Sequence, residues 1–201
     1  KNYQSVKNFD STSKGYIHSM SIPNILTFLR ILLIPFFILL FYLPFRGSHI
    51  VAALIFIFAA MTDWLDGYLA RSWDQVSKLG SFLDPVADKL MVITALILLV
   101  SDRALPYLAI PAIVISCREI MVSALREWMA EIGKRKQMAV TMLGKIKTTL
   151  QMLAIILLLL YKPGAWMGFA FAGYLLLYLA VFLTLWSMCL YLKAAWHDLS
   201  S

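Results

Sequence analysis

Six long hydrophobic stretches, separated by short polar connections, follow one another along the chain from residue 22 onward. Each is long enough to cross the hydrocarbon core of a bilayer as a helix, which takes roughly 20 apolar residues. The pattern predicts spans at 22–44, 49–68, 82–101, 104–130, 142–161 and 165–192. We therefore expect an all-α, polytopic membrane protein that folds as a bundle of six transmembrane helices.

The composition supports this class. With 61% hydrophobic and 14% charged residues among 201, the chain is too apolar for an ordinary soluble domain. Residues 1–19 differ, because they are polar and contain neither a signal peptide nor a span. We expect Met20 to be the natural start and the segment before it to be an extension left by an expression vector or a fused domain. One membrane domain is then expected to cover 20–198.

Basic residues are concentrated in two of the connections. The 71–80 and 131–147 connections hold seven Lys and Arg, whereas 45–48, 101–104 and 161–164 hold one each. By the positive-inside rule, we expect both chain ends and the 71–80 connection to lie in the cytoplasm. The net charge of +7 favours anionic lipid headgroups as partners and not nucleic acid, because the charges flank the spans.

Four aspartates interrupt the apolar pattern at the end of the second span and the start of the third. Asp63 and Asp66 are three residues apart and Asp84 and Asp88 are four apart, so each pair projects from one face of its helix. Each aspartate inside a span costs about 2.5–3.5 kcal/mol, which calls for a function. Converging carboxylates suit Mg²⁺ or Mn²⁺, so we expect a site for one or two divalent cations. The alternative is a set of salt bridges between helices, with Arg71, Lys78 and Lys89 as the basic partners.

Small residues and an arginine lie between the two aspartate pairs. Gly67 and Ala70 leave one helix face without bulk, and Gly80 permits close approach of another backbone. Arg71 is placed to pair with a phosphate. Metal ligands, an arginine and an open groove together indicate a diphosphate site.

At these positions the chain resembles the CDP-alcohol phosphotransferases. Their signature is matched throughout by Asp63-x2-Asp66-Gly67-x2-Ala70-Arg71-x8-Gly80-x3-Asp84-x3-Asp88. The segments PNILTFLRILLIPFF, SCREIMVSALREWMAEIGK and GKIKTTLQM are similar to those of the bacterial members that make phosphatidylglycerophosphate. The resemblance extends over about 20–198.

The resemblance implies a reaction and its participants. The acceptor sn-glycerol 3-phosphate would attack the β-phosphorus of CDP-diacylglycerol and release CMP, a first step toward phosphatidylglycerol and cardiolipin. Two Mg²⁺ or Mn²⁺ ions and a homodimer are expected, and Asp88 would be the general base. The first ion would be held by Asp63, Asp66 and Asp84, and the second by Asp63, Asp84 and Asp88. The CDP-lipid would be bound by Asp66, Gly67, Ala70, Arg71, Ser77 and Gly80.

The acceptor phosphate needs cationic groups that CDP does not already use. Arg118 and Arg126, about two turns apart, and Lys145 could form charge-assisted hydrogen bonds to it. Alternatively, Arg118 pairs with Glu119 while the other two lie at the headgroup level. An additional polar pocket is expected from Asn24, Thr27, Arg30 and Lys147. For Arg30, snorkelling to the headgroups remains an alternative to a polar interior. The adjacent charges Lys134, Arg135 and Lys136 cannot converge on one ligand and are interpreted as a topology anchor.

Two alternative functions stay open at this point. The same chemistry could use another acceptor, such as inositol phosphate, serine or phosphatidylglycerol. A divalent-cation transporter could also use four aspartates as a transport site. Against transport, the aspartates lie near span ends, and the sequence shows no internal repeat.

Overall fold

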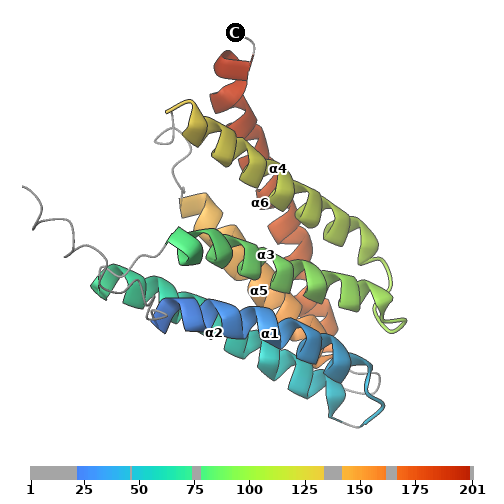
Figure 1. Cartoon of the computed structure of the whole chain (residues 1–201). Coiled ribbons are helices and arrows are strands. Elements are labelled where there is room, and N and C mark those ends of the chain that lie inside the picture. The colour runs from blue at the N-terminus through green and yellow to red at the C-terminus, as the bar shows by residue number, and fades with distance from the viewer. Residues whose placement is uncertain (1–21, 46, 74–77, 134–141, 162–166, 200–201) are drawn as a thin grey trace, which may run out of the picture.

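The computed structural model describes residues 22–45, 47–73, 78–133, 142–161 and 167–199, and these residues are helical with short turns (Figure 1). Their helices are α1 (Ile22–Tyr42), α2 (Ser48–Trp73), α3 (Lys78–Ser101), α4 (Ala109–Glu131), α5 (Met142–Leu160) and α6 (Gly168–Leu199). Each predicted span overlaps one helix, so the prediction of an all-helical fold is confirmed for the described residues. The extension predicted before Met20 and the basic anchor at 134–136 lie outside the described residues.

Several helix boundaries differ from the predicted spans. α3 begins at Lys78 and not at residue 82, and α6 ends at Leu199 and not at residue 192. α2 continues past residue 68 to Trp73, because Ala70 and Arg71 are good helix formers although the hydrophobic pattern ends there. α4 begins at Ala109 and not at residue 104. Pro106 disfavours helical backbone at the residue before it, and Tyr107 has a positive φ of 63° that a right-handed helix excludes.

The helices pack around α5, which contacts α2, α3 and α6. α1 lies against α2 and α3, while α4 crosses α6 and contacts α3 (Figure 1). The buried core combines residues of all six described helices, among them Phe37, Phe56, Leu99, Ile115, Ile155 and Leu177. This packing turns one face each of α3, α4 and α5 toward the others.

The α5–α6 contact is especially close at Gly173. A Cβ atom on this residue would lie 2.7 Å from Cγ of Leu158 on α5. Such a distance leaves no room for a side chain, so glycine is what allows the two helices to approach. The contact fixes α6 against α5. It thereby fixes the position of Ser187, which lies further along α6.

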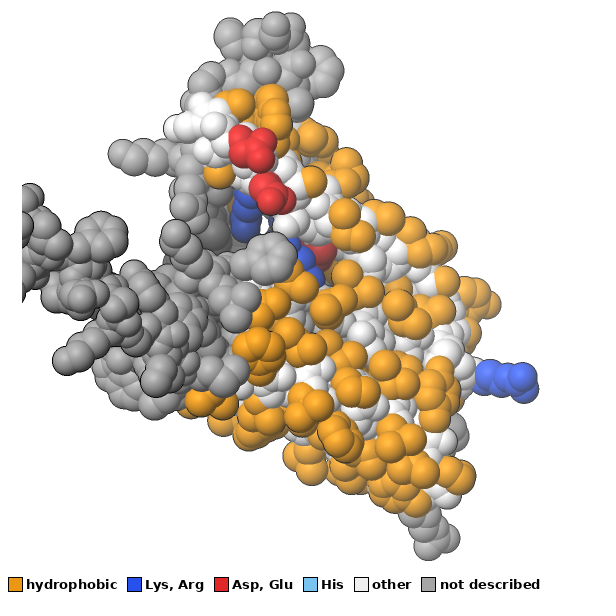
Figure 2. Space-filling model, in the orientation of Figure 1, with side chains coloured by type: hydrophobic (Ala, Val, Ile, Leu, Met, Phe, Trp, Pro, Cys, Tyr) orange, Lys and Arg blue, Asp and Glu red, His pale blue; other side chains and the backbone are white. Residues whose placement is uncertain are grey.

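The outer surface of the helices is largely apolar. Ile25–Tyr42 of α1 and Gly168–Lys193 of α6 are long and apolar enough to cross a membrane. Only 22% and 28% of these segments are buried in the protein, unlike the core helix of a soluble domain. Leu32, Leu39 and Phe182 are among the exposed side chains, and hydrophobic atoms dominate this face (Figure 2). Such a surface indicates association with a membrane.

Candidate active site

Arg30 and Asp63 connect α1 with α2 at the predicted site. The Arg30 side chain is 1% exposed, and its Nη1 donates a hydrogen bond of 3.0 Å to Oδ1 of Asp63. The guanidinium therefore lies in a polar interior and does not reach outward. Thr27, about one turn earlier on α1, is also buried, whereas the side chain of Asn24 lies outside the described part of the structure.

Asp88 occupies a junction between cavities. Its side chain borders a large polar cavity toward α4 and α5, a small chamber next to α5, and a narrow space that Arg30 also lines. Asp63, Arg30, Glu119 and Lys89 all lie within electrostatic range of its carboxyl group. Asp88 thus connects the α1–α2 side, where the aspartate motif begins, with the cationic side described below.

The two described carboxylates of the motif fit a cation site. Asp63 and Asp88 come from different helices and repel each other, a repulsion that a bound divalent cation would relieve. The side chains of Asp66 and Asp84 lie outside the described part. Within that part, no group of three or more His, Cys, Asp or Glu could hold a metal ion. The four-aspartate metal site therefore stays a prediction.

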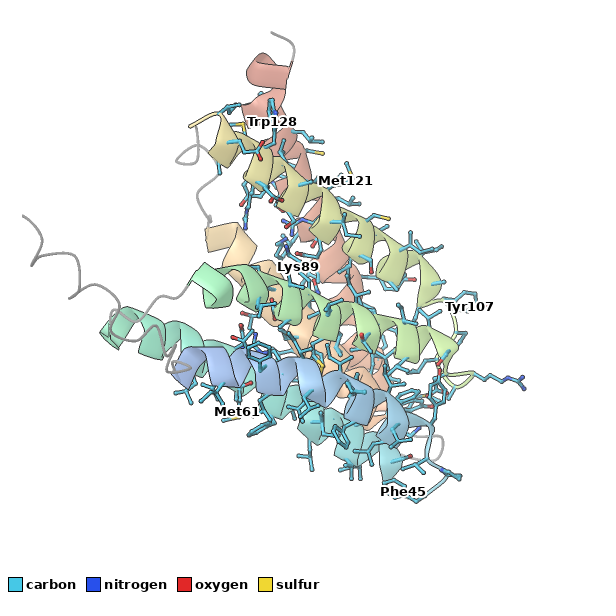
Figure 3. All side chains as sticks on the ribbon, viewed as in Figure 1. Phe45, Met61, Lys89, Tyr107, Met121 and Trp128 are labelled. Atoms are coloured by element: carbon cyan, nitrogen blue, oxygen red, sulfur yellow. The ribbon has the colours of Figure 1, made fainter. Side chains whose placement is uncertain are left out.

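A polar cavity of about 430 Å³ lies between α3, α4 and α5. Its charged lining comprises Asp88, Lys89, Arg118, Glu119, Arg126 and Lys147. Four basic groups against two acidic ones favour an anionic ligand. Figure 3 shows Lys89 between α3 and α4, where its Nζ donates a hydrogen bond to Ser123. Figure 2 shows charged side chains gathered in this part of an otherwise hydrophobic face.

Arg118 is held rigidly in the wall of the cavity. The side chain is 4% exposed, and its Nη1 lies 2.7 Å from Oε1 of Glu119. Its Nη2 donates a 3.0 Å hydrogen bond to Oγ of Ser187 on α6. Its Nε is buried and has no hydrogen-bond partner among the described residues. Arg118 therefore pairs with Glu119 and Ser187, and one of its buried donors has no partner in the described part.

Lys147 and Arg126 complete the cationic lining. Lys147 is 2% exposed. Its Nζ lies 3.7 Å from Oε1 of Glu119 and lacks a hydrogen-bond partner in the described part of the chain. Arg126 donates from Nη2 to the Tyr191 hydroxyl at 3.1 Å, and its guanidinium lies 5.4 Å from the centre of that ring. The Lys147 ammonium is thus paired in charge with Glu119, but its N–H donors can still bind an anionic ligand.

The structure brings together only part of the residue set that the sequence predicts. Arg118, Arg126 and Lys147 line one cavity with Asp88, and Arg30 approaches Asp88 from the other side. The side chains of the remaining candidates lie outside the described part; these are Asp66, Gly67, Ala70, Arg71, Ser77, Gly80, Asp84 and Lys145.

Sequence reasoning missed several uncharged polar groups of the site. Gln151 is 4% exposed and lines the small chamber next to Asp88. Ser123 and Ser187 hold Lys89 and Arg118. The available signal was spacing, since Gln151 follows Lys147 by four residues and so lies on the same face of α5.

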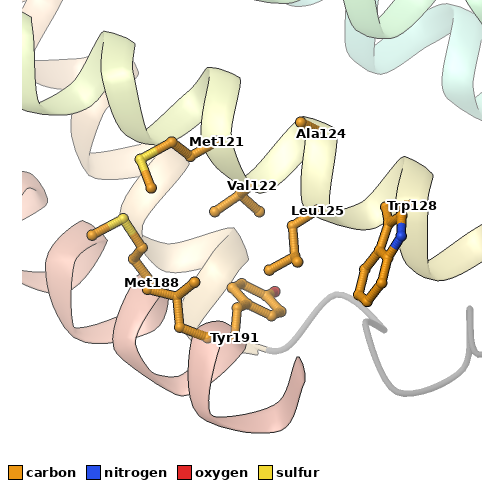
Figure 4. Close-up of a pocket in the computed structure, with 8 residues that line it drawn as sticks. Met121, Val122, Ala124, Leu125, Trp128, Met188 and Tyr191 are labelled. Atoms are coloured by element: carbon orange, nitrogen blue, oxygen red, sulfur yellow. The ribbon is translucent and has the colours of Figure 1, made fainter. Parts of the chain in front are cut away.

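An apolar groove of about 420 Å³ adjoins the polar cavity between α4 and α6. Met121, Leu125 and Trp128 of α4 and Met188 and Tyr191 of α6 surround it (Figure 4). Val122 borders both the groove and the cavity. The cationic site is therefore next to a surface that hydrocarbon can contact.

Comparisons with known proteins agree with the motif. The model of the CDP-alcohol phosphatidyltransferase family matches residues 20–186. A Yersinia enterocolitica protein is 52% identical over 180 residues, which cover 90% of this chain and 97% of that protein. Proteins of Salmonella typhimurium and Escherichia coli K12 are each 51% identical over 179 residues, or 89% of this chain and 97% of theirs. All three carry the name CDP-diacylglycerol--glycerol-3-phosphate 3-phosphatidyltransferase.

Proposed function

The chain belongs to the CDP-alcohol phosphatidyltransferase family, and we propose that it transfers the phosphatidyl group of CDP-diacylglycerol to sn-glycerol 3-phosphate. The products are phosphatidylglycerophosphate and CMP. One observation carries the choice of acceptor: a cavity lined by four basic side chains is also lined by Asp88, the last aspartate of the family motif. The names of the relatives support the same substrates.

The acceptor phosphate binds in the cationic cavity. Arg118, Arg126 and Lys147 converge on it from α4 and α5, with Lys145 as a further candidate on α5. Nε of both arginines and Nζ of Lys147 are buried without hydrogen-bond partners among the described residues, so a phosphate can accept from them. Charge-assisted bonds of this kind are about twice as strong as neutral ones. A volume of about 430 Å³ accommodates a small polar substrate.

The donor binds on the α2–α3 side, where the motif lies. Its CDP moiety contacts Asp66, Gly67, Ala70, Arg71, Ser77 and Gly80. Two Mg²⁺ or Mn²⁺ ions would be held by Asp63, Asp66, Asp84 and Asp88. When bound, such cations polarise the phosphorus and stabilise negative charge on the departing CMP. The proximity of the Asp63 and Asp88 carboxylates supports this assignment.

Asp88 acts as the general base between the two substrates. Its carboxylate takes the proton from the primary hydroxyl of the acceptor while the hydroxyl oxygen forms a bond to the β-phosphorus. The bond from that phosphorus to the oxygen shared with the α-phosphate breaks, and CMP leaves with the electron pair. Arg30 holds Asp63 beside this centre through its 3.0 Å hydrogen bond.

The protein works in the bacterial inner membrane as a six-span homodimer with its active site on the cytoplasmic side. Exposed apolar side chains on the helices support membrane insertion. The basic residues of the 71–80 and 131–147 connections support the orientation. CDP-lipids and glycerol phosphate would then both be reached from the side on which nucleotides are made.

A CMP-release assay on purified protein tests the function. CDP-diacylglycerol is supplied in detergent micelles with glycerol 3-phosphate, inositol phosphate or serine in turn, with and without Mg²⁺ or Mn²⁺. We expect metal-dependent CMP release with glycerol 3-phosphate alone. Release with another acceptor would change the substrate assignment, and divalent-cation flux into vesicles without CMP release would indicate a transporter.

A further inference from the structure

Gln151 is a buried polar residue beside the proposed base. It lies on α5, is 4% exposed, and its Oε1 is fully buried with no hydrogen-bond partner among the residues the structure describes. Leaving a buried amide oxygen unpaired costs about 1–3 kcal/mol. Such a cost in the interior of the helix bundle calls for a partner, and a bound ligand can supply it.

The amide borders a small chamber with room for a hydroxyl group. This chamber has a volume of about 40 Å³, and Asp88, Thr148 and Gln151 belong to its lining. One water needs only about 10–15 Å³ of such a cavity, so the chamber has room for a hydroxyl group. Asp88 and Lys89 also line the large cationic cavity, which places the chamber next to it.

The arrangement along α5 matches the order of groups in the proposed acceptor. Lys147 and Gln151 are four residues apart, which puts them on one helix face with a rise of about 6 Å between them. In glycerol 3-phosphate the secondary hydroxyl lies between the phosphate and the primary hydroxyl that reacts. With the phosphate at Lys147 and the primary hydroxyl at Asp88, the secondary hydroxyl is within the region that Gln151 lines.

We propose that Gln151 is a specificity-determining residue, whose side-chain amide forms a hydrogen bond with the secondary hydroxyl of the acceptor. The inference rests on the proposed function and deepens it. A hydroxyl both donates and accepts, so it can pair with either end of the amide. An acceptor without this hydroxyl leaves the amide unpaired, and sites of this kind strongly reject analogues that lack the expected group.

The test compares two acceptors that share a phosphate and a primary hydroxyl. One is sn-glycerol 3-phosphate, and the other is 3-hydroxypropyl phosphate, which lacks the secondary hydroxyl. We expect the unaltered protein to prefer the first by about 10- to 100-fold in kcat/KM. Gln151→Met replaces the amide by a side chain of similar length that has no amide to form hydrogen bonds. It should reduce that preference to about threefold or less, mainly because kcat/KM for glycerol 3-phosphate falls.

A matched control and two contrary outcomes make the test decisive. Met152→Leu alters an apolar residue of the same chamber and should keep the preference, because the change conserves volume. If Gln151→Met lowered kcat/KM by the same factor for both acceptors, the preference would be unchanged. That result would indicate a structural role and overturn the inference. No preference in the unaltered protein would overturn it too. Absence of CMP release with glycerol 3-phosphate would instead refute the proposed function.

Discussion

The variant Lys147→Met tests whether the Lys147 ammonium binds the acceptor phosphate or only stabilises the fold. Nζ of this side chain is buried, lies 3.7 Å from Glu119, and makes no hydrogen bond within the described residues. In Lys147→Met the cavity loses one charge-assisted bond to the acceptor phosphate, worth about 1.5–3 kcal/mol. We therefore expect kcat/KM for glycerol 3-phosphate to fall by about 10- to 150-fold.

Protein stability should respond differently. Burying the ammonium costs desolvation energy, and removing one partner of a buried ion pair lowers stability mainly when the other charge is left uncompensated. Glu119 keeps its 2.7 Å pairing with Arg118 in the variant. We expect a melting temperature in detergent that is unchanged or slightly higher.

The assay measures CMP release over a range of glycerol 3-phosphate concentrations at saturating CDP-diacylglycerol. A second series varies CDP-diacylglycerol at saturating glycerol 3-phosphate. Lys193→Met is the control, because it removes the same charge from an exposed position on α6; its kinetics should match those of the unaltered protein. Two results would show that the ammonium is structural and the reasoning wrong. One is an equal rise in KM for both substrates in Lys147→Met, and the other is a lower melting temperature with an unchanged kcat/KM for glycerol 3-phosphate.

Three further predictions concern the base, the cations and the helix contact. Asp88→Asn should still bind CDP-diacylglycerol but lower CMP release by about 10²-fold or more, and full turnover would remove Asp88 as the base. Chelation with EDTA should abolish CMP release and added Mg²⁺ or Mn²⁺ should restore it; activity after complete chelation would contradict the metal assignment. Gly173→Ala places a Cβ 2.7 Å from Leu158. It should cost about 1–3 kcal/mol of stability, seen as a lower melting temperature with both KM values unchanged. An unchanged melting temperature would mean that α6 can move away from Leu158 at little cost in free energy.

The helical fold could be predicted because long apolar stretches leave few alternatives. Exact ends could not be predicted from hydrophobicity alone. α4 starts later than its span, at Ala109, since Pro106 and the positive φ of Tyr107 interrupt the backbone within an apolar stretch. α2 continues to Trp73, because a helix does not need apolar residues to continue.

The charged part of the site was visible in the sequence, and its uncharged part was not. Arg118 and Arg126 stand out in an apolar helix, so they could be proposed from spacing. The partner of Arg30 could not be deduced, because Asp63 comes from another helix 33 residues later. Gln151 looks unremarkable in the sequence, and its importance follows only from burial and from the chamber beside Asp88.

The apolar groove between α4 and α6 adjoins a strongly polar cavity through the shared residue Val122. When an apolar groove lies beside a polar cavity, the two reactants can come from different phases. The lipid arrives by lateral diffusion within the bilayer, and the phosphorylated alcohol arrives from water. Its turnover should therefore depend on the mole fraction of donor in the surface as well as on the dissolved concentration of acceptor. Diluting the donor with inert detergent would slow the reaction even when the total amounts of protein and lipid remain the same.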